Sequence, residues 1–212
     1  TETDKVTVNP LLSPDNVART ASISVSSQKS NQGPAGLVDG TAFFPGAADS
    51  PQNKEWVSNN ETVGANVHMS WGSAVTIDHV WLFDLPRGAH YTTPDTGQIT
   101  SGTLSFSDGS TISVGALPDD TTQGLEVWFS PKTVTSLDFT VTSVKSGSTC
   151  IGMVEFGVFR TGSLGSHTTP SSLALNGGDG NDIVNLYGSA VSPTTVNGGN
   201  DTDVLNVNYT NP

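Results

Sequence analysis

The sequence predicts an all-β protein, and three observations carry that prediction. Charged residues make up only 13% of the 212 residues, about half of the ~25% that is typical of globular proteins. Glycine, serine and threonine are abundant, and long stretches with helical periodicity are missing. Short runs of β-branched and aromatic residues recur instead, separated by Gly, Asp, Pro and Ser turns. Regular short strands at this spacing predict a β-sandwich.

Composition divides the chain into four segments. Residues 1–15 form a lead-in that carries two prolines, and residues 16–160 contain the strong strand patterns. Residues 161–172 have the Gly, Ser, Thr and Pro content of a linker, and residues 173–212 are rich in Gly, Asn and Asp. We therefore expect a sandwich domain followed by a short glycine-rich appendage.

The strand patterns of the main segment follow one another at short intervals and mostly alternate between apolar and polar residues. They are VTIDHVWLFD (75–84), GTLSFSDGSTISVG (102–115), LEVWFS (125–130), TVTSLDFTVTSV (133–144) and IGMVEFGVF (151–159). In the second pattern, Asp108-Gly109 supplies the positive φ angles of a tight hairpin, so the apolar residues on both sides of it should share one core-facing side. These residues are Leu104, Phe106, Ile112 and Val114.

The strand at residues 75–84 also predicts a second apolar face. Val80 and Leu82 alternate with Trp81 and Phe83, so two large rings should lie opposite the core, where other residues must cover them. On the same strand Asp78 and His79 are adjacent, and we expect their side chains to point to opposite faces and not to meet.

The chain is strongly acidic. Twenty acidic residues against eight basic ones give a net charge of −12 and a pI near 4.3. Such a chain repels phosphate backbones and anionic lipid surfaces, which argues against nucleic acid as a partner. A surplus of carboxylates is compatible with divalent cations, and equally with solubility in salty or extracellular surroundings. No signal peptide and no apolar run of about 18 residues is present, so we expect a soluble, mature or excised piece of a secreted or cell-surface protein, without membrane insertion.

Six short motifs in order resemble the discoidin, or coagulation factor V/VIII type C, domain, nearest to its family 32 carbohydrate-binding modules. They are NVARTASISVSS, GLVDG, EWVS, VTIDHVWLFD, SGTLSFSDGS and IGMVEFGVF. The resemblance covers about residues 16–160. It implies an eight-stranded jelly-roll sandwich with Trp56 and Ile77 in the core, the N- and C-terminal strands side by side, and ligand-binding loops at one end.

The resemblance also implies a structural calcium ion. The matching residues are Asp39 and Thr41 in LVDGTA and Glu155 in GMVEFGVF. Calcium takes about six to eight hard oxygen ligands, which two carboxylates, a hydroxyl and loop carbonyls can supply. Two alternatives stay open: Asp49 of the inserted segment competes as a ligand, or Asp39 caps a turn while Glu155 faces solvent.

In this family galactose-type or amino sugars are often bound by an arginine and an asparagine after the IDHVWLFD strand, with an exposed aromatic ring. Here Leu85 stands in the place of the arginine and Arg87 in the place of the asparagine. Arg87, His90 and Tyr91 are therefore candidates for a substitute glycan site, since they combine a bidentate donor, a second polar group and a stacking ring. The alternative is ordinary loop chemistry without a ligand.

The insertion AFFPGAADSPQNK contains a second candidate surface. Phe43 and Phe44 are adjacent, so a regular strand cannot bury both rings, and at least one is expected either to pack under its own loop or to meet a ligand.

The glycine-rich C-terminus resembles calcium-binding β-roll (RTX) repeats. Residues 177–185 fit G-G-x-G-x-D-x-U-x with Asp182 at the acidic position, and residues 198–206 keep Asp203 but have Asp201 in place of the last glycine. The copies start 21 residues apart, so a strand and a return must fill the rest of each coil. The expected apolar side is Leu175, Val184, Leu186, Val196, Leu205 and Val207. The alternative is a series of Gly-Asn-Asp turns that imitates the motif.

Motifs for catalysis are missing from the sequence. It has no G-x-S-x-G, no H-E-x-x-H and no phosphate-binding loop, its four histidines are scattered, and the apolar neighbours of Cys150 predict a buried side chain rather than a nucleophile. We therefore expect a non-catalytic, lectin-like module that binds a polysaccharide or glycan, holds a structural Ca²⁺ and belongs with other domains in a larger parent protein. The alternative is a calcium-rigidified structural or adhesive spacer without a small-molecule ligand.

Overall fold

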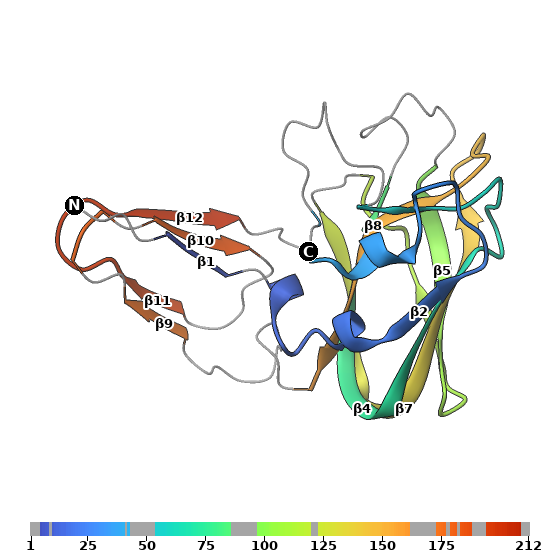
Figure 1. Ribbon diagram of the computed structural model, residues 1–212, viewed down its shortest axis with the longest axis horizontal. Coiled ribbons are helices and arrows are strands. Elements are labelled where there is room, and N and C mark those ends of the chain that lie inside the picture. The colour runs from blue at the N-terminus through green and yellow to red at the C-terminus, as the bar shows by residue number, and fades with distance from the viewer. Residues whose placement is uncertain are drawn as a thin grey trace. The chain divides into compact units, whose positions relative to one another are not determined.

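The computed structural model describes residues 5–8, 10–40, 42, 54–85, 97–119, 123–161, 173–176, 179–181, 183–187 and 194–208. The chain forms two compact units, a larger one from Pro14–Thr161 and a smaller one from Thr1–Ser13 with Gly162–Pro212 (Figure 1). Strands and short 3₁₀ helices make up the regular structure of the described residues, which confirms the all-β class. None of the helices in these ranges is long and apolar enough to cross a membrane.

The larger unit is an antiparallel β-sandwich. Its elements are η2 (Val17–Thr20), β2 (Ser22–Val25), η3 (Pro34–Val38), β3 (Trp56–Val57), β4 (Asn66–Asp84), β5 (Ile99–Phe106), β6 (Thr111–Val114), β7 (Gly124–Val144) and β8 (Gly152–Arg160). Hydrogen bonds connect the strands in the order β3-β8-β4-β7-β5-β6, with β2 beside β4.

Strands β4 and β7 are long and take part in both layers of the sandwich (Figure 1). The C-terminal part of β4 lies between β8 and the N-terminal part of β7, whereas its N-terminal part lies between β2 and the C-terminal part of β7. Strands β5 and β6 continue the second layer beyond β7. The change of layer coincides with a register shift between Ser70 and Val75.

The core lies between the two layers. Trp56 and Ile77 are fully buried in it, as the six motifs implied. Phe139 of β7 meets Phe156 of β8 edge to face, with ring centroids 6.0 Å apart. Each fully buried side chain of this size contributes about 1.5–3 kcal/mol from the apolar area removed from water. An isolated bridge joins Asn16 to Phe159 at the two ends of the unit, but the terminal strands β2 and β8 do not pair with each other as expected, because each pairs with β4.

The predicted hairpin is confirmed, although Gly109 alone of the two predicted turn residues has a positive φ angle, and Asp108 does not. Strand β5 pairs with β6 so that Leu104 faces Ile112, and the turn between them places Gly109 at φ 83°. The N–H of Gly109 donates to the carbonyl of Phe106 at 2.9 Å, and the carboxylate of Asp108 accepts from the N–H of Ser110 at 2.8 Å. Local turn chemistry therefore determines the register of these two strands.

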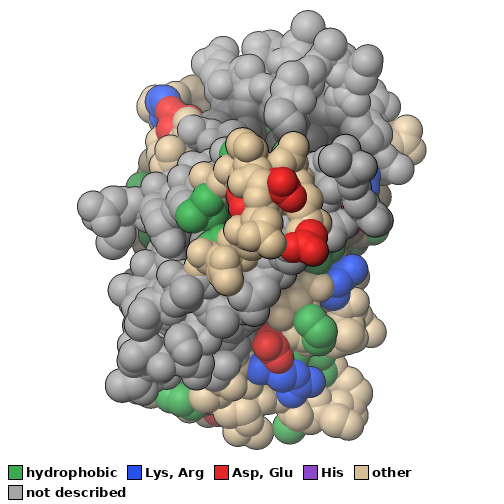
Figure 2. All heavy atoms as spheres, turned by 90° about the vertical axis from the view of Figure 1, so that its left-hand side faces the viewer, with side chains coloured by type: hydrophobic (Ala, Val, Ile, Leu, Met, Phe, Trp, Pro, Cys, Tyr) green, Lys and Arg blue, Asp and Glu red, His purple; other side chains and the backbone are tan. Residues whose placement is uncertain are grey.

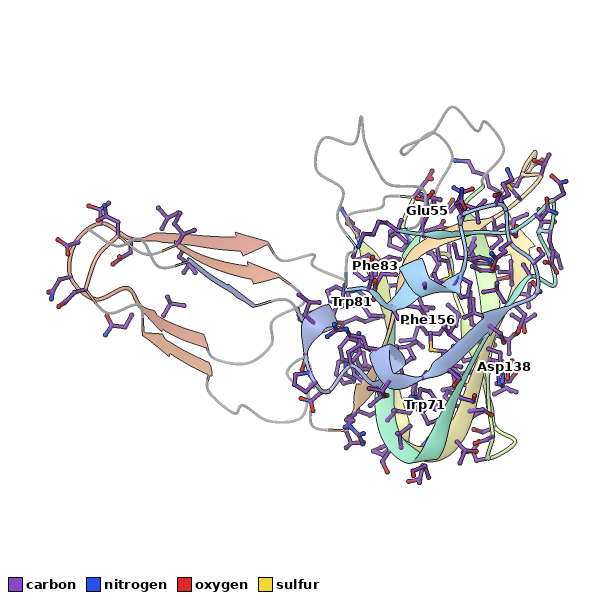
Figure 3. The ribbon with its side chains drawn as sticks, in the orientation of Figure 1. Glu55, Trp71, Trp81, Phe83, Asp138 and Phe156 are labelled. Atoms are coloured by element: carbon purple, nitrogen blue, oxygen red, sulfur yellow. The ribbon has the colours of Figure 1, made fainter. Side chains whose placement is uncertain are left out.

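The second apolar face on β4 is also present. Trp81 and Phe83 lie outside the main core cluster, with ring centroids 4.7 Å apart, and they are only 6% and 0% exposed. Figure 3 labels this pair together with Phe156. Gly124 of β7 leaves room for the rings, because a Cβ there would lie 2.4 Å from the indole nitrogen of Trp81.

The smaller unit consists of parallel strands. These are β1 (Lys5–Val8), β9 (Leu173–Asn176), β10 (Ile183–Tyr187), β11 (Thr194–Asn197) and β12 (Val204–Asn208), with a 3₁₀ turn, η1, at Pro10–Leu12. They form one sheet in the order β1-β10-β12 and a second sheet of β11 and β9. Paired residues in these sheets are separated by one sequence repeat of 21 residues, as in Leu173 with Thr194 and Ile183 with Val204. Successive repeats therefore stack as two coils. Strand β1 of the N-terminal lead-in adds a third strand, which the sequence pattern did not indicate.

Candidate functional site

Several connections between strands meet at one end of the sandwich, which we call the loop end. Strands β4 and β7 finish there, and strands β5 and β8 begin there. Backbone hydrogen bonds tie these connections together across the sequence. The donor–acceptor pairs are Leu85 N with Gly152 O (3.1 Å), Gly97 N with Cys150 O (3.1 Å), Lys145 N with Gln98 O (2.9 Å) and Leu117 N with Ile99 O (2.9 Å).

The residues expected to contact a glycan lie outside the described residues. They are Arg87, His90, Tyr91, Phe43 and Phe44. Their described neighbour Leu85 is buried and packs on Gly152, where a Cβ would lie 2.8 Å from a methyl group of Leu85. Leu85, which stands where the resemblance implied an arginine, therefore serves packing against Gly152.

Asp84 is the last residue of β4 and is fully buried at the loop end. Its Oδ1 accepts from the N–H of Leu85 at 3.0 Å, and its Oδ2 accepts from the N–H of Ile99 at 3.0 Å. Burial raises the pKa of Asp84 well above its usual value, more than the two backbone hydrogen bonds lower it, and the charge of Asp119 raises it further. The sequence pattern did not distinguish this residue from an ordinary strand end.

The structure brings Glu155 of β8 to the Asp39–Gly40 turn, as the resemblance implied. Glu155 is fully buried, and its Oε2 accepts from the N–H of Gly40 at 3.1 Å, while Gly40 has φ 85°. The alternative in which Glu155 faces solvent is therefore wrong. The carboxylate of Asp39 pairs with Lys54 at 2.8 Å. Thr41 and Asp49 lie outside the described residues.

A second buried glutamate was not singled out from the sequence. Glu55 is fully buried just before β3, and its Oε1 accepts from the side-chain amide of Gln32 at 2.7 Å (Figure 3). Gly36 packs against it so closely that a Cβ there would lie 2.2 Å from the Glu55 nitrogen. Next to it, the indole N–H of Trp56 donates to the carbonyl of Ser27 at 2.8 Å. The motif EWVS contains Glu55, but only the tertiary structure shows that its carboxylate is inside.

The buried pair Asp78 and His79 corrects an expectation. Their side chains meet, with His79 Nδ1 2.6 Å from Asp78 Oδ1, and both are buried. The strand has a register shift between Ile77 and His79, so the strict alternation on which the expectation depended does not hold there. The imidazole is stacked between Trp128 at 3.9 Å and Phe159 at 4.6 Å. This enclosed ring has the environment of a packed side chain, and Cys150 is buried as well, as predicted.

The turns of the smaller unit carry the remaining candidate ligands. Asp182 lies outside the described residues, whereas Asp203 is exposed and lies so close to Gly198 that a Cβ there would be 2.0 Å from its Oδ2. The neighbouring turn residues bond from one coil to the next. The pairs are Asn200 Nδ2 with Asp179 Oδ1 (3.0 Å), Gly180 N with Asp201 Oδ2 (3.2 Å) and Thr202 N with Asn181 Oδ1 (2.9 Å).

Leu205 next to these turns differs from the expected apolar side, because it is exposed like its neighbour Val204. Val204 and Leu205 are 46% and 49% exposed. In Figure 2 acidic and apolar side chains lie together near the centre of the face shown. Throughout the parts of the chain that the structure describes, no group of three or more His, Cys, Asp or Glu side chains is arranged to hold a metal ion.

Comparisons with known proteins concern the sandwich. The family described as "Domain of unknown function (DUF7402)" matches residues 16–159. A search of curated proteins found no match. Among solved structures, the chain is similar to the lectin domain of lectinolysin complexed with Lewis B antigen, with a TM-score of 0.52 and 19% identity over 71% of this chain and 99% of that one.

Two further solved structures show the same similarity. The family 32 carbohydrate-binding module of C. perfringens NanJ in complex with galactose has a TM-score of 0.50 and 15% identity, over 68% of this chain and 97% of that chain. The Streptococcus pneumoniae fucose binding module SpX-3 has a TM-score of 0.50 and 13% identity, over 68% of this chain and 96% of that chain. At these identities the similarity shows a shared fold. It confirms the β-sandwich that the six motifs implied, although the described residues of the larger unit pair as seven strands and not as the implied eight.

Proposed function

Since the chain belongs to the DUF7402 family through residues 16–159, we propose that this family's sandwich is a non-catalytic module that binds carbohydrate. The main support is the loop end, where buried polar groups fix the connections between strands and the segment with Arg87, His90 and Tyr91 begins and ends. The similar structures are described as complexed with Lewis B antigen, as complexed with galactose, and as a fucose binding module. A glycan is therefore the ligand class that fits best.

The expected contacts follow from the chemistry of the three side chains. Arg87 offers a planar fork of donors for neighbouring hydroxyls, Tyr91 offers a ring for stacking on a sugar face, and His90 adds a polar group. The net charge of −12 favours neutral over acidic polysaccharides, because the chain repels anions at a distance. We assign the module to a secreted or cell-surface protein, where such glycans are met.

We also propose a structural calcium ion at the turn beside Glu155. A fully buried carboxylate is costly unless donors or a cation compensate it, and Gly40 already brings the Asp39 turn to within hydrogen-bond distance of it. Glu155, Asp39 and Thr41 would hold the ion together with loop carbonyls, and Asp39 would exchange Lys54 for the metal. The ion would supply a rigid link between the turn and β8.

Retention on immobilised glycans tests the carbohydrate proposal. The parent chain is expected to bind a neutral glycan in an array that contains galactose, fucose, chitin-derived and glucan structures. Arg87→Ala and Tyr91→Ala should each abolish that binding without lowering the melting temperature. Arg160→Ala, an exposed arginine at the other end of β8, is the matched control and should bind like the parent. An array without any bound glycan would contradict the proposal.

A second candidate function is supported by the smaller unit. Its strands stack as parallel coils linked by side-chain bonds across the turns, and stacked coils of this kind are typical of extended structural segments. In this reading the protein is a calcium-rigidified spacer without a small-molecule ligand. The spacer function would be favoured if no glycan on the array is bound and if residues 173–212 become ordered only in the presence of calcium.

A further inference from the structure

The stack of coils in the smaller unit has two different ends. Its larger sheet is parallel and runs in the order β1-β10-β12, so β1 and β12 are the two edges of this sheet among the described residues. Both edge strands pair with β10 in equivalent registers, because Ile183 lies opposite Lys5 on one side and opposite Val204 on the other. Strand β1 thus takes the position that a preceding coil would occupy, and it closes one end of the stack.

The sequence of β1 explains why it fits this position. Val6 is aligned with Val184 of β10, which in turn is aligned with Leu205 of β12. The next residue is Thr7 on β1 and an asparagine on both other strands. All three strands therefore carry an apolar residue followed by a polar one at the same level of the sheet. In the part of the chain that the structure describes, no strand pairs with the outer edge of β12.

The end of the stack at β12 exposes apolar side chains. Val204 and Leu205 at the start of β12 are 46% and 49% exposed. Adjacent residues of a strand point to opposite sides of the sheet, so apolar surface is open to solvent on both sides of β12. The terminal repeats of stacked proteins need a polar outer face to stay soluble. An apolar end with an unpaired strand edge therefore favours association with another strand.

The acidic turn before β12 determines the direction in which such a strand can add. Asp201 and Asp203 lie in this turn and are exposed. A parallel partner coil would bring its own acidic turn next to them, as Asp179 is next to the turn of the following coil within the chain, and like charges repel. An antiparallel partner strand places the two acidic turns at opposite ends of the strand pair. Charge therefore favours antiparallel addition.

We propose that the outer edge of β12 is a dimerisation surface, and that its partner is β12 of a second copy of this chain in antiparallel orientation. An antiparallel pair of identical strands has twofold symmetry, which is the commonest symmetry of homo-oligomers. Full overlap of Val204–Asn208 places Asn206 opposite itself. The sheet then continues from one copy into the other, and each copy covers the exposed end of its partner. This inference is independent of the proposed glycan function.

Sedimentation of the whole chain tests the dimer. One strand edge per copy makes a small interface, so the parent should convert from monomer to dimer between about 10 μM and 1 mM. Leu205→Lys places a charge at the exposed end and should remain monomeric over this range. Val63→Lys changes a valine of the larger unit that is 60% exposed, and it is the control that should dimerise like the parent. A parent that stays monomeric, or a Leu205→Lys variant that dimerises equally, would overturn the proposal.

A disulfide link tests the strand pairing itself and does not depend on the Leu205→Lys variant. Residues directly opposite each other in an antiparallel pair have Cα atoms about 4.5–5.5 Å apart, which lies within the range of about 4.4–6.8 Å for disulfides. Asn206→Cys should therefore form a covalent dimer in oxidised glutathione. Val63→Cys is the control for random contacts of exposed thiols and should stay unlinked, and the native Cys150 is buried. Assemblies larger than a dimer, or an unlinked Asn206→Cys, would overturn the antiparallel pairing.

Discussion

Individual buried carboxylates organise the loop end. Glu55, Asp84 and Glu155 are fully buried, and each accepts a hydrogen bond from an amide group of another segment of the chain. Buried polar groups are stable only when they are hydrogen-bonded, so these three side chains fix the segments that donate to them. The loop end of the sandwich is thereby defined by polar contacts, while the core is defined by apolar packing.

Glu155→Gln should abolish the stabilisation by calcium. A ligand that binds only the folded state at a hundredfold excess over its dissociation constant adds about 2.7 kcal/mol, so the parent should melt at a higher temperature in calcium than in chelator. Glutamine keeps an acceptor for the N–H of Gly40 but removes the charge. Glu61→Gln, which neutralises a loop carboxylate bonded to Ser26 and Ser27, is the control and should keep the calcium shift. An equal shift in Glu155→Gln and the parent would contradict the site.

The carboxylate of Asp108 in the β5–β6 hairpin should make the stability of the fold depend on pH. The side-chain and backbone hydrogen bonds of Ser110 lower the pKa of Asp108, with a smaller contribution from Lys132. A lowered pKa stabilises the folded state above the unfolded pKa of 3.8, and the stabilisation is lost as the pH falls through the folded pKa. Asp108→Ala should therefore melt below the parent at pH 7, and the difference should shrink towards pH 2. A difference that is independent of pH would contradict this account.

At the level of secondary-structure elements, some strand pairs depend on local contacts and others on contacts between distant parts of the chain. The β5–β6 hairpin depends on a short turn between Phe106 and Thr111, whereas β1 and β10 pair across most of the chain, with Lys5 opposite Ile183. Parallel pairing of distant strands requires the rest of the chain to bring them together. Strand β1 also completes a sheet that contains only two coils, and few coils bury little apolar surface.

Removal of residues 1–8 should loosen the smaller unit and leave the sandwich intact. Strand β10 would lose the partner opposite β12, so its amide hydrogens should exchange faster, while the amides of β4 and β7 keep their protection. Hydrogen exchange of the truncated and parent chains measures both. Replacement of residues 5–8 by Gly-Ser-Gly-Ser, which keeps the chain length, should give the same result. Unchanged protection of β10 would show that β1 contributes nothing to the unit.

At the scale of the whole molecule, a net charge of −12 is distributed over two units of different construction. The turns of the smaller unit place Asp179 and Asp201 one coil apart, and their like charges oppose stacking unless cations screen them. Calcium should therefore slow cleavage of residues 173–212 by chymotrypsin in the intact chain. Magnesium at the same concentration is the control for simple screening. Equal cleavage with calcium and with chelator would favour the alternative interpretation, in which these residues form Gly-Asn-Asp turns that imitate the motif without binding calcium.

Several features of the fold could be predicted from local sequence patterns alone. Alternation predicted the strands around Leu104 and Phe106, the Asp108-Gly109 turn predicted the hairpin, and the order of six motifs implied a sandwich with Trp56 and Ile77 inside. It also indicated that Glu155 comes near the Asp39 turn. These properties depend on neighbours within a few residues or on a recognisable series of motifs.

Other features depend on contacts between distant segments and could not be predicted from the sequence. Asp84 and Glu55 look like ordinary polar residues at strand ends, and their burial depends on segments that the fold brings over them. The contact between Asp78 and His79 depends on a register shift that alternation does not reveal. The addition of β1 to β10 depends on the meeting of two distant segments. In each case the free energy of a polar contact or strand pair depends on partners that are remote in sequence. A local sequence pattern cannot identify these partners.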